Sequence, residues 1–142
     1  MKIVVDANVV FAALMRSSIT RELLLYPFIS YYSPDFLLTE LQKHKKELMN
    51  KANLSEATYS NALKLILANL KVISKLNYGS EIGRASKIME YVDKADAVYL
   101  ALSIAIKADG IWTYDRHFEK QRTIKALKTK DVAAIVWRGK KI

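Results

Sequence analysis

KIVVDAN, residues 2–8, is the segment from which the expected fold is most readily inferred. Its apolar part, residues 3–5, is typical of a short, fully buried strand, and Asp6 follows it directly. The pattern returns at residues 111–115, Ile-Trp-Thr-Tyr-Asp. Acids placed just past the strand ends of an α/β fold point at the crevice where such folds bind ligands. We therefore expect Asp6 and Asp115 to meet at one edge of a sheet.

Apolar runs of the strand type alternate with amphipathic helical patterns along the rest of the chain. Strands are expected at residues 2–5, 29–32, 72–73, 111–113 and 132–137. Helices are expected at residues 8–15, 19–25, 34–49, 55–70, 80–92 and 95–108. This alternation predicts an α/β fold with a mostly parallel sheet that helices cover on both faces.

Local signals indicate where some of these helices begin and end. Ser33-Pro34 favours a helix start, with Ser as the N-cap and Pro at the first helical position. Ser55 is expected to cap the next helix. Asp109-Gly110 is a stop signal for the apolar helix before it. Trp112 and Trp137 fall inside strand patterns, so we expect both in the core.

The bulk composition is that of a globular domain. The 142 residues fit one domain, residues 1–142, with a hydrophobic fraction of 51% and a charged fraction of 26%. Cysteine is absent, which excludes disulfides, thiolate metal sites and cysteine nucleophiles and fits a cytoplasmic protein. No apolar stretch approaches the length of a membrane span, so we expect no membrane partner.

The net charge of +9 favours a polyanionic partner such as RNA. Most of it is concentrated near the carboxyl end, because residues 116–142 hold nine lysines and arginines against two acids. A run of charged residues can also be a solvent-exposed surface that binds nothing. Where the runs lie beside candidate metal ligands, we expect contact with RNA phosphates from Lys43, Lys45, Lys46, Arg116, Lys120 and Arg122.

Four acids from separate segments could form one metal site: Asp6, Glu40, Asp96 and Asp115. Clustered carboxylates repel one another and therefore need a cation between them, and oxygen-only ligands suit Mg²⁺ or Mn²⁺. The residues alone also allow a structural role, because an acid at a strand end or in a first helical turn can cap a turn or a helix. Glu47, further along the helix of Glu40, is an alternative to it.

The chain resembles the PIN-domain family through four motifs in the family's order. They are Asp6-Ala-Asn8, Glu40, Asp96-Ala-Val-Tyr-Leu-Ala-Leu and Thr113-x-Asp115-x-x-Phe118. The resemblance extends over residues 1–137. It implies a three-layer α/β/α sandwich with the first strand at the centre of a parallel sheet. It also implies a metal-dependent ribonuclease, either the toxin of a VapBC-type toxin–antitoxin pair or an RNA-processing enzyme.

Carried over residue by residue, the resemblance makes Asp6, Glu40, Asp96 and Asp115 the catalytic, metal-binding acids. Asn8, Thr113 and Asp93 are supporting residues in the same comparison. The implied reaction is hydrolysis of RNA phosphodiester bonds by a metal-activated water, which leaves a 5′-phosphate and a 3′-hydroxyl. It requires no histidine, so His117 is expected at the surface, although it could touch a phosphate.

The resemblance also implies protein partners. An antitoxin would bind a toxin of this kind. A second copy of the chain could pair with the first through apolar faces at residues 23–25 or on the helix of Tyr59.

Two other functions compete with a nuclease. A phosphotransferase or phosphatase of the haloacid dehalogenase type needs Asp-x-Asp after the first strand, but Asn8 stands at the second position. A non-catalytic RNA- or protein-binding module with an incomplete metal site remains the alternative. Metal-dependent cleavage of single-stranded RNA would separate this module from an enzyme.

Overall fold

Among the residues that the structure describes, five short strands form one sheet in which every neighbouring pair is parallel. They are β1 (Lys2–Val5), β2 (Ser30–Pro34), β3 (Leu70–Ile73), β4 (Gly110–Trp112) and β5 (Ala126–Leu127). Their order in the sheet is β3-β2-β1-β4-β5, with β1 at the centre as expected. The computed structural model describes residues 1–15, 19–90 and 94–140. Ile3, Val4 and Val5 are inaccessible to solvent, because β1 has a strand on each side and helices on both faces.

The described residues also form α-helices and short 3₁₀ helices. The α-helices are α1 (Ala7–Met15), α2 (Ile19–Leu24), α3 (Phe36–Ala52), α4 (Glu56–Ala68), α5 (Ile82–Ile88), α6 (Lys94–Ala105) and α7 (Thr129–Lys140). The 3₁₀ helices are η1 (Lys75–Asn77), η2 (Gly79–Glu81) and η3 (Arg116–Lys120). None of the helices in residues 1–15, 19–90 and 94–140 combines the length and apolarity that crossing a membrane demands.

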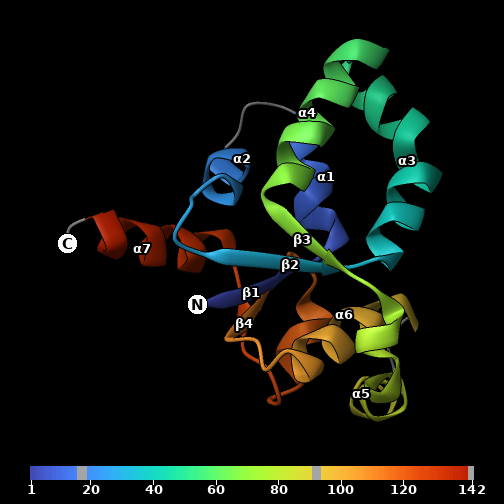
Figure 1. The fold of residues 1–142 in the computed structure, drawn as a ribbon, viewed down its shortest axis with the longest axis vertical. Coiled ribbons are helices and arrows are strands. Elements are labelled where there is room, and N and C mark those ends of the chain that lie inside the picture. The colour runs from blue at the N-terminus through green and yellow to red at the C-terminus, as the bar shows by residue number, and fades with distance from the viewer. Residues whose placement is uncertain (16–18, 91–93, 141–142) are drawn as a thin grey trace.

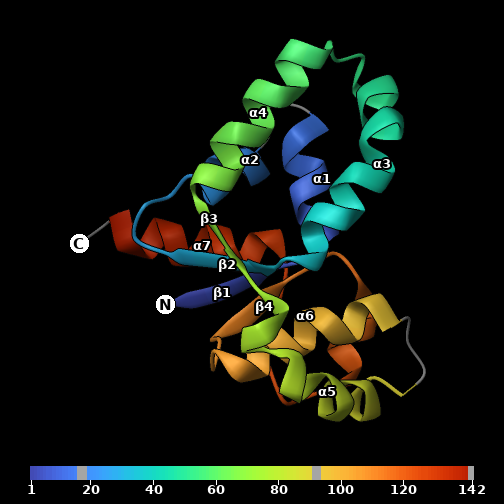
Figure 2. The same cartoon turned by 45° about the vertical axis from the view of Figure 1, so that its right-hand side comes forward.

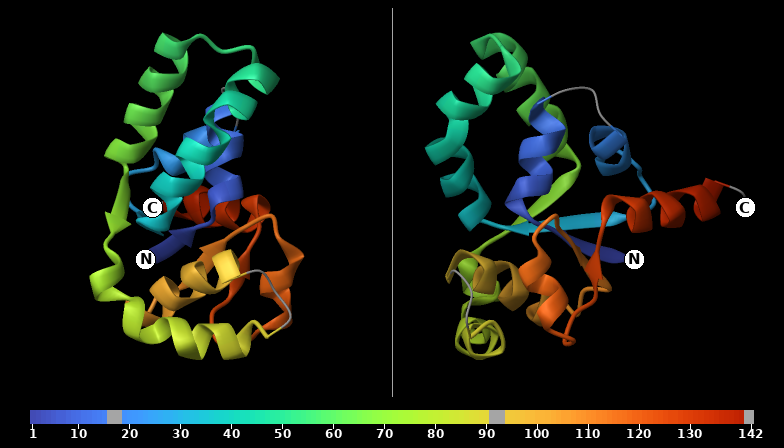
Figure 3. Two further views of the ribbon diagram at one scale, coloured as in Figure 1. Left: turned by 90° about the vertical axis from the view of Figure 1, so that its right-hand side faces the viewer. Right: turned by 180° about the vertical axis from the view of Figure 1, so that it is seen from behind.

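Helices cover both faces of the sheet, so the predicted three-layer α/β/α arrangement is confirmed (Figure 1). On one face lie α1 to α4; on the other lie α5 and α6, with α6 packed against β1, β2 and β4. Figure 2 shows α7 on the first face, where it contacts α2. The hairpin of α3 and α4 stands away from the sheet, as two further views show (Figure 3).

The strand expected at residues 132–137 is wrong, because this segment belongs to α7 and the fifth strand lies earlier, at Ala126–Leu127. The β-branched residues suggested a strand, but Val132, Ile135 and Val136 also have the i, i+3, i+4 spacing of one helix face. Asp131 starts the helix by accepting a hydrogen bond from the backbone N–H of Lys128 at 2.8 Å. Trp137 is consequently 62% exposed and not in the core, whereas Trp112 is fully buried.

The helix start expected at Ser33-Pro34 is also wrong. Both residues end β2, and the helix begins two residues later, at Phe36. The buried Ser33 hydroxyl donates to the carbonyl of Val5 at 2.9 Å, so it joins two strands instead of capping a helix. The cap at Ser55 is confirmed, because its hydroxyl accepts from the N–H of Thr58 at 3.1 Å.

The end of α6 does not use the stop signal at Asp109-Gly110. The helix ends at Ala105, and Lys107 takes the left-handed conformation with φ of 54°. The N–H of Ala108 then donates to the carbonyl of Ser103 at 2.9 Å, which closes the helix end. Gly110 instead lies in β4, where a Cβ atom would stand 2.5 Å from Cδ1 of Leu127. It is therefore needed for close pairing with β5.

The apolar faces suggested for a second copy of the chain are buried in part, while Leu25 is half-buried and Leu65 on α4 is exposed. Leu23, Leu24 and Tyr59 are 6%, 1% and 2% exposed, because α2 and α4 turn these side chains toward the core. The helix expected at residues 80–92 begins with η2, and α5 ends at Ile88; residues 91–92 of that expectation lie outside the described residues.

Candidate metal and active site

The carboxyl ends of β1 and β4 bring Asp6 and Thr113 side by side. The strand register pairs Val5 with Trp112, and the N–H of Asp6 donates to the Trp112 carbonyl at 3.0 Å. The Thr113 hydroxyl donates to Oδ2 of Asp6 at 2.8 Å and accepts from the N–H of Asp115 at 2.9 Å. One hydroxyl therefore links the acid after β1 to the acid after β4.

Asp6 is a buried carboxylate, only 4% exposed. Burial raises its pKa to about 7, and the nearby carboxylates of Asp96 and Glu40 contribute to the rise. Hydrogen bonds from Thr113 and from the N–H of Ala7, at 2.8 Å each, act in the opposite direction. A cation among these groups would favour the ionised form of Asp6, so the donor set fits a divalent metal ion.

Glu40 reaches this site from the second turn of α3. Its Oε1 accepts a hydrogen bond of 2.5 Å from the hydroxyl of Tyr99, which is buried in α6. Burial of Tyr99, with Glu40 beside it, raises the pKa of the phenol, so Tyr99 stays a donor. Glu47 instead pairs with Lys51 at 3.1 Å and with His44 at 3.3 Å. Of these two acids, Glu40 is the one that contributes to the raised pKa of Asp6.

Asp96 and Asp115 come together around His117. The Nδ1 atom of His117 lies 3.1 Å from Oδ1 of Asp115 and 3.7 Å from Oδ2 of Asp96. Ligand atoms of these three residues lie within 4.8 Å of one another, close enough to hold one metal ion. His117, expected to be a surface residue, is 49% exposed yet turns its ring toward both acids.

The predicted supporting residues have different surroundings. Thr113 contacts Asp6 directly, as described above. Asn8 is exposed and lines a hollow that Glu40 also lines. Asp93 lies outside the described residues.

The predicted RNA-binding residues form two groups. Lys43, Lys45 and Lys46 line a hollow beside Glu56, which shares no lining residue with the hollow that Glu40 lines. Lys45 forms an ion pair with Glu56 at 2.5 Å. Arg116 instead follows Asp115 directly and lines a pocket next to the acids. Lys120 and Arg122 are exposed at and just after the end of η3.

Comparison with known proteins agrees with this geometry. The family model described as PIN domain matches residues 4–134 of the chain. The chain belongs to the PIN-domain family. This PIN domain matches none of the curated protein sequences.

Solved structures share the fold of this PIN domain. PAE2754 from Pyrobaculum aerophilum is similar with a TM-score of 0.68 and 16% identity, over 100% of this chain and 91% of that one. A second similar structure is VapBC2 from Rickettsia felis, solved with a DNA fragment from its promoter. It has a TM-score of 0.64 and 17% identity, over 90% of this chain and 98% of that one.

Two residues that contact the acids of the PIN domain were missed by sequence reasoning. Tyr99 follows Asp96 by three positions, so the two share one face of α6, and a polar-tipped ring in an apolar helix was an available signal. His117 follows Asp115 by two positions within the motif that carries the family resemblance. Its contact with Asp96 joins two separate segments and has no local signal.

Proposed function

We propose that this PIN domain is a metal-dependent endoribonuclease that hydrolyses RNA phosphodiester bonds. One observation carries the proposal: the buried carboxylate of Asp6, whose pKa the nearby Asp96 and Glu40 help to raise, is tied through Thr113 to Asp115. Such a cluster is costly without a cation. PIN domains are generally nucleases, and the basic chain suits a polyanionic substrate.

In this proposal, Asp6, Glu40, Asp96 and Asp115 hold one or two Mg²⁺ or Mn²⁺ ions, and His117 stands beside the last two. A bound ion of this kind supplies an activated water and offsets the negative charge of the phosphate. The chain's other residues orient the acids: Tyr99 holds Glu40, and Thr113 holds Asp6.

Cleavage of single-stranded RNA with and without Mn²⁺ tests the proposal. We expect cleavage by the wild type with Mn²⁺, and its loss in Asp6→Asn and Asp96→Asn with the fold retained by circular dichroism. Glu22→Gln, an exposed change on α2, serves as the control and should cleave like the wild type. If the chain binds RNA with the same affinity with or without metal and with or without these substitutions, and does not cleave it, the chain is a non-catalytic binding module.

A pair of substitutions on α3 tests which glutamate belongs to the site. The Glu40→Gln variant should lose most of its RNA-cleaving activity, because Glu40 contributes to the raised pKa of Asp6 and accepts a hydrogen bond from Tyr99. Glu47→Gln should keep most of it, since Glu47 pairs with Lys51 and His44. The reverse order would assign the metal-binding role to Glu47.

We also propose that the chain acts as the toxin of a toxin–antitoxin pair. The similar VapBC2 structure supports this role, because it is a VapBC protein bound to promoter DNA. A small, acidic, DNA-binding protein encoded beside this chain, which co-purifies with it and blocks RNA cleavage, is the expected finding. A solitary gene would favour RNA processing. Sedimentation of the isolated chain would show whether it pairs as a homodimer.

A further inference from the structure

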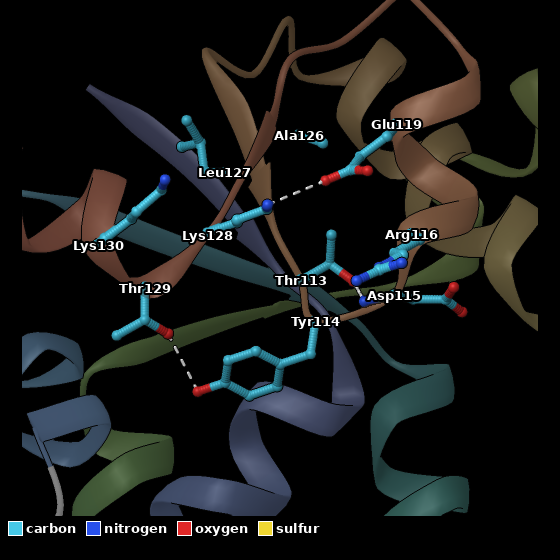
Figure 4. A pocket seen from close by; sticks show the side chains of 10 residues that line it. All are labelled: Thr113, Tyr114, Asp115, Arg116, Glu119, Ala126, Leu127, Lys128, Thr129 and Lys130. Carbon is cyan, nitrogen blue, oxygen red and sulfur yellow. Dashed lines mark hydrogen bonds and ion pairs between the residues drawn. The ribbon is translucent and has the colours of Figure 1, made fainter.

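Tyr114 lies between two hollows in the surface. It lines a pocket of about 390 Å³ together with Arg116, Lys128 and Lys130 (Figure 4). It also lines the hollow that contains Glu40 and Asn8. Tyr114 is thus the residue that lines both the hollow of Glu40 and the pocket that Asp115 borders.

The ring of Tyr114 is held in place from its hydroxyl end. Its oxygen shares a hydrogen bond with the Thr20 hydroxyl at 2.9 Å and accepts one from Thr129 at 3.1 Å. Thr129 in turn accepts from the indole N–H of Trp112 at 3.1 Å. Tyr114 is nevertheless 47% exposed. A ring that is fixed before binding offers a stacking surface at little conformational cost.

Positive charge gathers in the pocket that this ring lines. Arg116 comes from η3, Lys128 directly precedes α7, and Lys130 lies in its first turn. The carboxylate of Glu119 lies in the same pocket, 3.6 Å from the Lys128 ammonium. Figure 4 shows the Asp115 carboxylate pointing away from Lys128 and Lys130. The pocket can therefore accept a phosphate group while Asp115 serves the acid cluster.

We propose that this pocket binds one unpaired nucleotide next to the cleaved bond of an RNA strand. The base stacks on Tyr114, and the phosphate meets Arg116, Lys128 and Lys130. Every base has a π-face, so such stacking binds single-stranded RNA without reading its sequence. The inference rests on the proposed function, since it places the nucleotide beside the acid cluster.

Binding of a fluorescein-labelled single-stranded RNA in EDTA tests the inference, because no hydrolysis occurs without metal. We expect Tyr114→Leu to weaken binding about tenfold and Tyr114→Phe to change it far less, since the ring remains. Lys128→Gln with Lys130→Gln should weaken binding and flatten its salt dependence. Lys64→Gln, an exposed lysine on α4, is the matched control and should bind like the wild type.

A fully abasic strand of the same length tests the stacked base. The wild type should bind it more weakly than RNA, and Tyr114→Leu should show a smaller difference between the two strands. Wild-type affinity in both Tyr114→Leu and the lysine variant, or no RNA binding by the wild type, would overturn the inference. If these variants also fail to bind an antitoxin, the pocket would be assigned to a protein partner instead of RNA. A different result is that the wild type fails to cleave RNA with Mn²⁺ but binds it more tightly than Tyr114→Leu does. In that case the proposed function fails, and the nucleotide-binding pocket stands.

Discussion

Thr113 shows how one hydroxyl can position two acids. It donates to Asp6 and accepts from the N–H of Asp115, so its removal leaves both carboxylates less firmly held. We expect Thr113→Val, which keeps the shape of the side chain, to lower Mn²⁺-dependent cleavage about 10- to 100-fold. The cost to folding should be about 1 to 3 kcal/mol, because the buried Asp6 loses a hydrogen-bond donor.

Thr113→Ser is the control for that change, because it restores the hydroxyl without the methyl group. Cleavage by the serine variant should return close to that of the wild type. Equal cleavage by the valine variant and the wild type would show that Thr113 does not orient the acids.

The acids after strands were the predictable part of the candidate site. Asp6 and Asp115 follow buried apolar runs, and parallel strands end at one edge of a sheet, so their proximity follows from the pattern. Glu40 and Asp96 lie on helices, whose rotation relative to the sheet is set by packing. Only the family resemblance selected them, and the bond from Tyr99 to Glu40 depends on that packing alone.

At the scale of elements, Asp35 ties the start of α3 to the segment after β3. Its carboxylate accepts from the Tyr78 hydroxyl at 2.5 Å and from the N–H of Lys75 at 3.1 Å. The bond from Tyr78 is the main reason that the pKa of Asp35 is lowered. Asp35 therefore stabilises the fold at pH values above its unfolded pKa of about 4, and this contribution is lost as the pH falls through the lower folded value.

Tyr78→Phe should consequently destabilise the chain at pH 6 by about 1 kcal/mol. The difference from the wild type should shrink as the pH falls below about 4, the unfolded pKa of Asp35, and through the lowered pKa of the folded wild type. Urea unfolding from pH 3 to pH 6 measures this difference. A difference that is independent of pH would mean that Tyr78 contributes through packing and not through Asp35.

Two elements show why local patterns were insufficient. In α7, β-branched residues matched a strand, while the bond from Lys128 to Asp131 and the spacing of Val132 and Val136 favoured the helix. At Ser33-Pro34, a good helix start was overridden because the sheet needed two more residues of β2 to pair with β3. Each outcome depends on the partner that the segment meets in space, which a single stretch of sequence does not contain.

At the scale of the whole molecule, the candidate site exists only in the folded chain. Its acids span residues 6 to 115 and come from two strand ends and two helices. A metal ion held by all of them would therefore bind the folded state and not the unfolded one. Folding and metal binding would then be linked, and the metal would raise the stability of the whole fold.

Thermal unfolding with increasing Mn²⁺ measures that linkage. At a concentration one hundred times its Kd, Mn²⁺ should stabilise the wild type by about 2.7 kcal/mol, which raises Tm by several degrees. Asp96→Asn should show a much smaller rise, because it removes a carboxylate whose ligand atom lies close to those of Asp115 and His117. Glu22→Gln should respond like the wild type, since it leaves the four acids intact. An equal rise in Asp96→Asn would mean that Mn²⁺ binds elsewhere, and then the cluster around Asp6 would have to carry its charge without a metal ion.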